Sequence, residues 1–333
     1  MPAAPKSPPS DRPVADATAA AANDLPGQGV PSVEVPAVEV PAGDFVRDTC
    51  LTGTGPGRYE AHIPEAWKVI YAFGGMSMAY AIRAIQQEVD RPDLDLLSAH
   101  ALYCSPVGCT DLVIEAEALR SGRTGAQGRS ILRVAGSDDV GIAGTATFGR
   151  LDASPISYID TVMPAGAGRP HDHEPPPPRP PDHPFPALPF HQQTEWRPAI
   201  GTKWWEEDFE WEPGPAVTGS WHRLAVEPTT ADGSYDPLAL CIPGDSLGQS
   251  IGQRLGPPEE DGTEFFTITL ELSLDIFNRQ QTPWVFTSVR APVASDGYGW
   301  GIVDLFGESG ELLAVARQRA RLRMFQVGDG FFG

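Results

Sequence analysis

Apolar residues surround most of the helix that residues 73–89, FGGMSMAYAIRAIQQEV, predict. Over the turns that follow Gly75, only Ser77 and Arg83 interrupt a run of methionine, alanine, tyrosine and isoleucine. A surface helix shows one apolar stripe, so a helix that is apolar on most sides is expected to be enclosed by other elements.

Strand-like segments surround this helix in the sequence. They carry β-branched and alternating apolar residues and are separated by turn signals such as Ser-Pro and Ser-Asp-Asp. The segments are residues 58–63 before the helix and 96–104, 111–120, 128–136 and 140–150 after it.

The second part of the chain repeats this order. The pattern predicts a strand at 237–244, a helix at 246–255, and strands at 265–277, 284–293, 299–307 and 311–325. A constant offset of 171 residues (307 − 136) places the second copy on the first. It pairs Gly307 with Gly136, Ala314 with Ala143, Asp245 with Gly74, and Gln318 with Thr147.

The repeat predicts an α+β fold of two similar units. An antiparallel sheet must bury one face, and a strongly curved sheet can do so by wrapping a single central helix. We therefore expect two antiparallel sheets, each wrapped around one helix.

Composition sets the boundaries of these units. Residues 1–43 are rich in Pro and Ala and are expected to be disordered. Residues 152–193 include GRPHDHEPPPPRPPDHPFPALP, which predicts a stiff proline-rich linker. The predicted units are 44–151 and 194–326, followed by a short tail at 327–333.

Charge narrows the function classes. Lys and Arg total 24 against 44 for Asp and Glu, a formal net charge of −20, which argues against nucleic-acid or anionic-membrane partners. The sequence shows no signal-peptide core and no apolar run long enough for a membrane helix, so we expect a cytoplasmic protein. The four cysteines form no metal or disulfide pattern.

Several motifs together resemble the acyl-CoA thioesterase II family. They are FGGMSMAYAIRAI, the LRSGRT turn, SLDIF, AVARQRARLR and the Trp-rich second half, and the likeness extends over residues 44–326. Members of that family carry two hotdog folds in one chain. The resemblance implies a tandem (double) hotdog, hydrolysis of an acyl-CoA or acyl-carrier thioester, and no cofactor or metal.

The resemblance also implies a polar trio in the second unit. It assigns the carboxylate to Asp245 in IPGDSLG, the hydroxyl to Ser273 in LSLD, and the amide to Gln318 in VARQRA. Family members usually have Thr in place of Ser273. They also have His in place of Ile276, and Gln-Glu-Gly where this chain has Gln-Arg-Ala from Gln318.

The residues themselves fit this chemistry. Thioester hydrolysis needs a base for a water molecule and donors for the developing oxyanion. Asp245 would be the base, positioned by Gln318 and Ser273, although an Asp beside a helix start also serves as a simple cap. Gly74 and Gly75 would line the substrate site at a helix N-terminus, or form a tight turn.

Arginines near the first unit's Gly turn suggest a phosphate contact. Arg120 and Arg123, with Arg129 nearby, could meet the phosphates of coenzyme A or of a carrier's pantetheine arm. The alternative is that they are solvated turn charges.

Other functions remain open on the sequence. Residues 244–248 match G-x-S-x-G with Ser246 as a nucleophile, but no His follows Ser246, as that α/β-hydrolase order requires. His171, His173 and His183 could bind a metal or belong to a solvated linker. A non-catalytic acyl-binding protein is the main rival, and a dehydratase would need a His-Asp pair at the helix. Homo-oligomer formation stays open.

Overall fold

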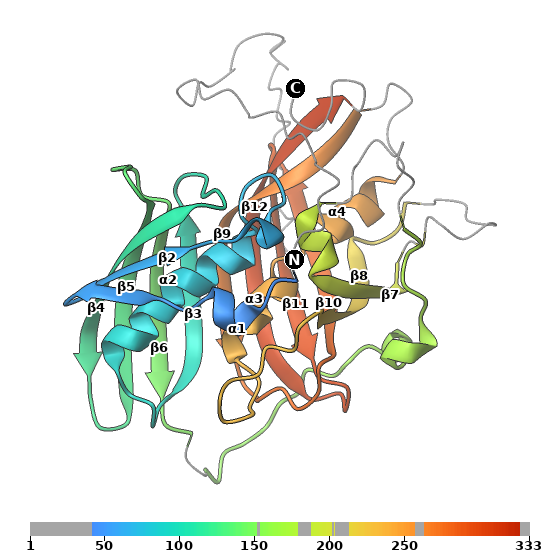
Figure 1. Ribbon diagram of the computed structural model, residues 1–333. Helices are drawn as coiled ribbons and strands as arrows, with labels where there is room; N and C mark the ends of the chain where they lie inside the picture. The colour runs from blue at the N-terminus through green and yellow to red at the C-terminus, as the bar shows by residue number, and fades with distance from the viewer. Residues whose placement is uncertain are drawn as a thin grey trace, which may run out of the picture.

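The computed structural model describes residues 42–151, 154–178, 188–201, 203, 213–256 and 263–326. Within these residues, twelve strands form one sheet in the order β1-β2-β4-β5-β6-β3-β9-β12-β11-β10-β8-β7 (Figure 1). The described strand pairs are antiparallel. Residues 1–41 of the predicted tail, residues 152–153 and 179–187 of the predicted linker, and the end of the chain at 327–333 lie outside the described residues.

The strands fall into two sets along the chain. The first set is β1 (Thr52–Gly55), β2 (Arg58–His62), β3 (Asp95–Tyr103), β4 (Asp111–Ser121), β5 (Gly125–Val134) and β6 (Ile142–Gly149). The second set is β7 (Thr194–Ile200), β8 (Val217–Leu224), β9 (Thr263–Ile276), β10 (Val285–Ser295), β11 (Tyr298–Phe306) and β12 (Leu312–Gln326). The order of the second set mirrors the order of the first set across the β3–β9 pair.

Helices of 3 to 16 residues precede and connect these strands. They are α1 (Phe45–Asp48), η1 (Glu65–Trp67), α2 (Gly74–Val89), η2 (Ala165–Ala167), η3 (Pro170–Asp172), η4 (Pro189–Gln192), η5 (Pro237–Leu240), α3 (Cys241–Gly244) and α4 (Gly248–Leu255). None of the described helices is long and apolar enough to cross a membrane.

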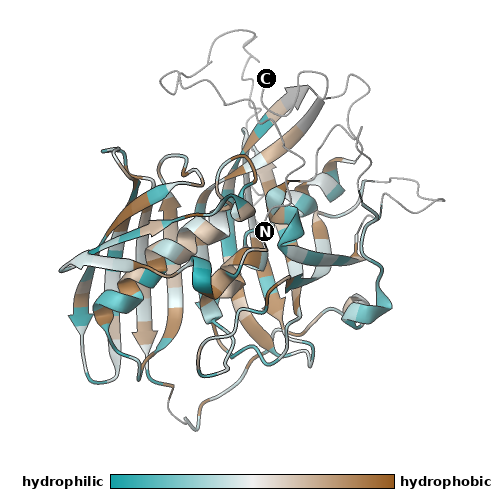
Figure 2. Ribbon diagram, viewed as in Figure 1, coloured by the Kyte–Doolittle hydropathy of each residue, from teal (hydrophilic) through white to brown (hydrophobic). Residues whose placement is uncertain are grey.

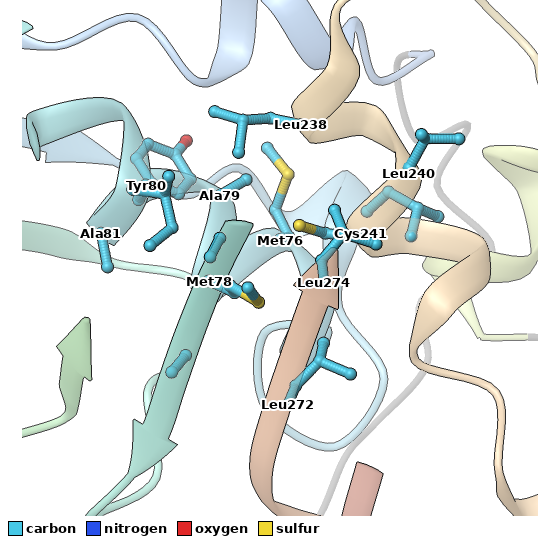
Figure 3. Packing of buried hydrophobic residues seen from close by; sticks show 14 of the residues in the cluster. Met76, Met78, Ala79, Tyr80, Ala81, Leu238, Leu240, Cys241, Leu272 and Leu274 are labelled. Carbon is cyan, nitrogen blue, oxygen red and sulfur yellow. The ribbon is translucent and has the colours of Figure 1, made fainter. Parts of the chain in front are cut away.

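The helix α2 is enclosed, as its apolar pattern predicts. Its buried side chains face β4, β5 and β6 on one side and the η5–α3 segment on another. Figure 3 shows Met76 and Ala79 beside Leu238 and Cys241, with Leu272 and Leu274 of β9 beneath them. The core of the first half therefore continues into the second half.

The second half differs from the first at its helix. Residues 237–244 were expected to form a strand, but Asp236 caps the 3-10 helix η5 by accepting from the Leu238 N–H, and the turn continues into α3. Pro237 sits at the first helical position, where its missing N–H costs nothing. By the repeat offset, the continuous helix α2 corresponds to the shorter helix α4, and the turn of α3 ends just before Asp245.

The proline-rich segment does not act as a free spacer where the structure describes it. Ala167 is buried in a second core cluster with Trp221 and Phe286, on the face of the sheet opposite α4. The Trp221 Nε1–H donates to the Ala167 carbonyl at 2.9 Å, and Arg197 donates to two carbonyls of the same segment. Burial of these aromatic rings holds the segment against the sheet.

Besides the short 3-10 helices η1 to η4, the sequence pattern missed α1, β1, β7 and β8. Their apolar residues are sparse, as Figure 2 shows for the outer strands, so periodicity alone gives little signal. The constant offset also fails on one strand. Gln318 faces the core, whereas Thr147 lies between the core residues Ala146 and Phe148 and faces the opposite side.

We predict that Ile82→Ala in α2 lowers the free energy of unfolding by about 2 to 5 kcal/mol, because Ile82 is fully buried and the change leaves a cavity. Urea denaturation measures this value. Gln87→Ala, on the exposed side of the same helix, is the control and should change stability by less than about 0.5 kcal/mol. Equal effects of the two changes would show that α2 is not enclosed.

Candidate active site

Asp245 occupies the break between α3 and α4. It is the C-terminal cap residue of α3, and its backbone at φ −96° and ψ 62° turns the chain away from the helical path. The interruption places its side chain inside the fold, at the start of α2, while part of the residue keeps contact with solvent.

Two side chains of the second half hold one carboxylate oxygen. Thr269 Oγ1 of β9 donates to Asp245 Oδ1 at 2.8 Å, and Gln318 Nε2 of β12 donates to the same oxygen at 2.5 Å. Gln318 Nε2 also donates to Thr269 Oγ1 at 2.8 Å, which closes a triangle of hydrogen bonds. The side-chain oxygen of Gln318, Oε1, accepts from the Leu247 N–H at 3.0 Å, so both the oxygen and the nitrogen of this side-chain amide are fixed.

The first half holds the other carboxylate oxygen. The Gly75 N–H, in the first turn of α2, donates to Asp245 Oδ2 at 3.0 Å. Tyr103 Oη of β3 donates to the Gly74 carbonyl at 2.7 Å and so fixes the helix start. The site is built from both copies of the repeat.

The glycines at this helix start are required by close approach. A Cβ on Gly74 would lie 2.3 Å from Asp245 Oδ2, and a Cβ on Gly75 would lie 2.2 Å from the Cys241 carbonyl oxygen. Any side chain at either position would displace the carboxylate or α3. This explains the two glycines that open the apolar helix.

Burial raises the pKa of Asp245 to about 6, because a charged carboxylate is poorly solvated in this position. The hydrogen bonds from Thr269 and from the Gly75 N–H act in the opposite direction, since they stabilise the charged form. A carboxyl group with this pKa is mostly ionised at neutral pH and can still carry a proton, which suits a general base.

The expected hydroxyl is not the one that the structure brings to Asp245. Ser273 lies on β9 between the core residues Leu272 and Leu274, so its side chain faces the opposite side of the sheet. Thr269, four residues earlier on the inward face, contacts Asp245 instead. Of the three residues implied by the family resemblance, the structure therefore brings together Asp245 and Gln318 but not Ser273.

The expected arginines also lie away from Asp245. Arg120 and Arg123 flank the β4–β5 turn, where the Arg123 carbonyl accepts from Arg91, just beyond the C-terminal end of α2. Gly74 and Gly75 begin this 16-residue helix, which is about 24 Å long, so the turn with the arginines lies near the opposite end of the helix from the carboxylate. Asp245 also lines neither of two cavities, of about 620 and 150 Å³, that described residues form.

The alternative sites lose support in the described part of the chain. The Asp245 side chain accepts from α2 and does not cap α4, whose N-terminus has no side-chain cap. Ser246 belongs to an antiparallel fold without the α/β-hydrolase sheet, and its Oγ is buried without a partner. His171 packs on Trp284 and His173 bonds the Ala167 carbonyl, while His183 lies outside the described residues. No metal-binding group of three His, Cys, Asp or Glu occurs among described residues.

Solved structures with the same architecture define the class of fold. A hotdog-fold protein from Alicyclobacillus acidocaldarius matches 84% of this chain and 97% of its own at 22% identity and a TM-score of 0.69. Acyl-CoA thioesterase II TesB2 from Mycobacterium marinum matches 84% of this chain and 98% of its own at 19% identity and a TM-score of 0.63. A tesB protein from Mycobacterium avium subs paratuberculosis matches the same shares at 16% identity and a TM-score of 0.63. The fold is a hotdog fold with a mostly antiparallel sheet.

Family models identify the protein more closely. The acyl-CoA thioesterase N-terminal domain matches residues 63–149, and the acyl-CoA thioesterase C-terminal domain matches residues 170–322. The chain therefore belongs to the acyl-CoA thioesterase family and is a thioester hydrolase. A search of curated proteins finds no match.

Sequence reasoning missed Thr269 and Tyr103. Simple alternation along β9 places Thr269 on the face opposite Leu272 and Leu274, and it reaches the inward face only because one extra residue bulges between them. The register shift opposite Arg319 and Ala320 is that bulge. The sequence contains no clear signal for it.

We predict that Thr269→Val lowers kcat for thioester hydrolysis by about tenfold or more, because it removes a hydrogen bond to a charged group while keeping the shape. Ser273→Ala, on the same strand but the opposite face, should leave kcat within about twofold. Steady-state release of free thiol measures both. A larger loss for Ser273→Ala than for Thr269→Val would return the hydroxyl role to Ser273.

Proposed function

We propose that this thioesterase hydrolyses acyl-CoA thioesters by direct attack of a water molecule that Asp245 activates. The observation that carries the proposal is the carboxylate itself. Both of its oxygens are held by donors, burial raises its pKa to about 6, and solvent still reaches the residue.

The reaction would proceed in two steps. Asp245 takes a proton from water as the water oxygen bonds to the thioester carbonyl carbon, and the carbonyl oxygen becomes an oxyanion. The tetrahedral intermediate then collapses, the carbon–sulfur bond breaks, and the proton passes from Asp245 to the leaving thiolate. The products are a carboxylic acid and free thiol, and no covalent enzyme intermediate forms.

The neighbours of Asp245 would have separate roles. Thr269 and Gln318 fix the orientation of the carboxylate, and the Gly75 N–H prevents its rotation. Because two of these donors occupy Oδ1 and one occupies Oδ2, one lone-pair position on Oδ2 is left for the water. A fixed base avoids reorganisation at the moment of reaction.

The family assignment favours a coenzyme A thioester over a carrier-bound one, since both matching family models are acyl-CoA thioesterase domains. The same assignment favours the enzyme over a non-catalytic binding protein. In this proposal the chain is a tandem of two hotdog units, 44–151 and 194–326. The mirrored strand order and the shared site at the β3–β9 junction support that arrangement.

We predict that Asp245→Asn lowers kcat by about 100-fold or more, because the amide cannot accept the proton. Thiol release from acyl-CoAs of increasing chain length measures the loss, and circular dichroism checks that the variant folds. Asp138→Asn, the same change on an exposed turn, is the control and should retain activity. If Asp245→Asn kept wild-type turnover, the proposed base would be wrong.

We predict that kcat/KM rises with pH through about 6 and is constant above it, because Asp245 acts only when ionised. Thr269→Val should move this limb to higher pH, since it removes a hydrogen bond that favours the charged form. Initial rates between about pH 4.5 and 8.5 measure both profiles. A limb at the same pH in both enzymes would show that another group titrates.

A further inference from the structure

A small polar pocket lies on the sheet face opposite Asp245. It has a volume of about 150 Å³ and is lined by His100 of β3, Glu271 and Ser273 of β9, Trp300 of β11, and Arg317 and Gln318 of β12. The Gln318 amide is used on the other face by Asp245. The pocket therefore lies on the other face of the sheet from the catalytic cluster, although Gln318 contributes to both.

Two polar atoms in this pocket are buried and have no protein partner. They are His100 Nε2 and Ser273 Oγ. The two residues are directly opposite each other in the β3–β9 pair and point to the same face. A buried donor or acceptor without a partner is costly, so these atoms are expected to meet something that enters the pocket.

The charges around the pocket favour an anion. Arg317 forms an ion pair with Asp275 at 3.8 Å, which is too long for a hydrogen bond, so its guanidinium can still donate to a ligand. Glu271 is the one carboxylate among the lining residues, and Arg319 pairs with it at 3.4 Å. A neutral His100 and Ser273 can each donate one hydrogen bond.

The surrounding strand adds positive potential. Arg317, Arg319, Arg321 and Arg323 alternate along β12. Arg321 lies over the Tyr298 ring at 4.8 Å, and no ion pair to an acidic group is found for Arg321 or Arg323 among the described residues. The whole chain carries a net charge of −20, so this row of arginines on β12 is a local region of positive charge on an acidic protein.

We propose that this outer-face pocket binds the oxyanion group of a small molecule, a carboxylate or a phosphate. Arg317 would pair with the anion, Ser273 and His100 would donate to it, and the Trp300 ring would form one wall. The volume accommodates one such group. This site does not depend on the proposed role of Asp245.

The test follows the His100 side chain by long-range ¹H–¹⁵N NMR, with the signal assigned through His100→Gln. Sodium phosphate and sodium acetate are the probes, each titrated against sodium chloride at equal ionic strength. We expect a saturable shift of the His100 signal with one or both oxyanions and none with chloride. A response to only one probe would show which oxyanion the pocket takes.

Variants separate the pocket from general charge effects. Arg317→Gln and Ser273→Ala should each weaken the saturable binding about tenfold or more, since each loses a donor to an anion. Arg129→Gln, an arginine paired with Glu117 on another exposed strand, should leave binding unchanged. Asp245→Asn should also bind the oxyanion with unchanged affinity, because Asp245 lies on the other face of the sheet.

Three outcomes would overturn the proposal. They are a shift that does not saturate, the same shift with chloride, and binding that survives Arg317→Gln unchanged. The first two would show that the pocket does not select an oxyanion, and the third would show that Arg317 does not pair with the anion.

Discussion

The antiparallel pairing of β3 with β9 is the contact on which the rest of the molecule depends. It runs from Ser98 opposite Asp275 to Leu102 opposite Glu271 and joins the two halves into one sheet. Through this junction the start of α2 meets α3, close enough that only glycine fits at two successive positions. The site could not form in either half alone, because the base comes from one half and the Gly75 donor from the other.

The buried carboxylate has a measurable cost. A shift of the Asp245 pKa from 3.8 to about 6 corresponds to about 3 kcal/mol against the charged form. Because the folded-state pKa is raised, the contribution of this group to stability is full below about pH 4 and is lost as the pH rises through about 6. The hydrogen bonds from Thr269 and Gly75 limit this loss of stability. The part of the pKa shift that they do not cancel makes Asp245 a base near neutral pH.

Much of this architecture could be predicted from the sequence. The apolar periodicity of residues 73–89 indicated an enclosed helix, and the repeated order of elements indicated two related halves. The segment 237–244 was misjudged because a short apolar run looks the same in a strand and in a helix, and only Asp236 and Pro237 mark the helical start. The strands β7 and β8 carry too little alternation to be seen.

The site was predictable only in part, for a geometric reason. Asp245 and Gln318 belong to local motifs, but the face that a strand residue occupies depends on every bulge before it. One extra residue between Thr269 and Glu271 turns Ser273 away from the carboxylate and brings Thr269 to it. Motif matching follows spacing along the chain and cannot detect such a shift.

The duplication also explains why one chain would hold one such base. At the helix start, the residue that the repeat aligns with Asp245 is Gly74, and Gly74 lies against Asp245 itself. A Cβ at Gly74 would lie 2.3 Å from Asp245 Oδ2, so a second aspartate there would clash with the first and repel its charge. The two helix starts meet at one point, and that point has room for a single carboxylate. Two identical halves would place two carboxylates at this point, where only one fits. The chain avoids the clash because it has Asp in one half and Gly in the other.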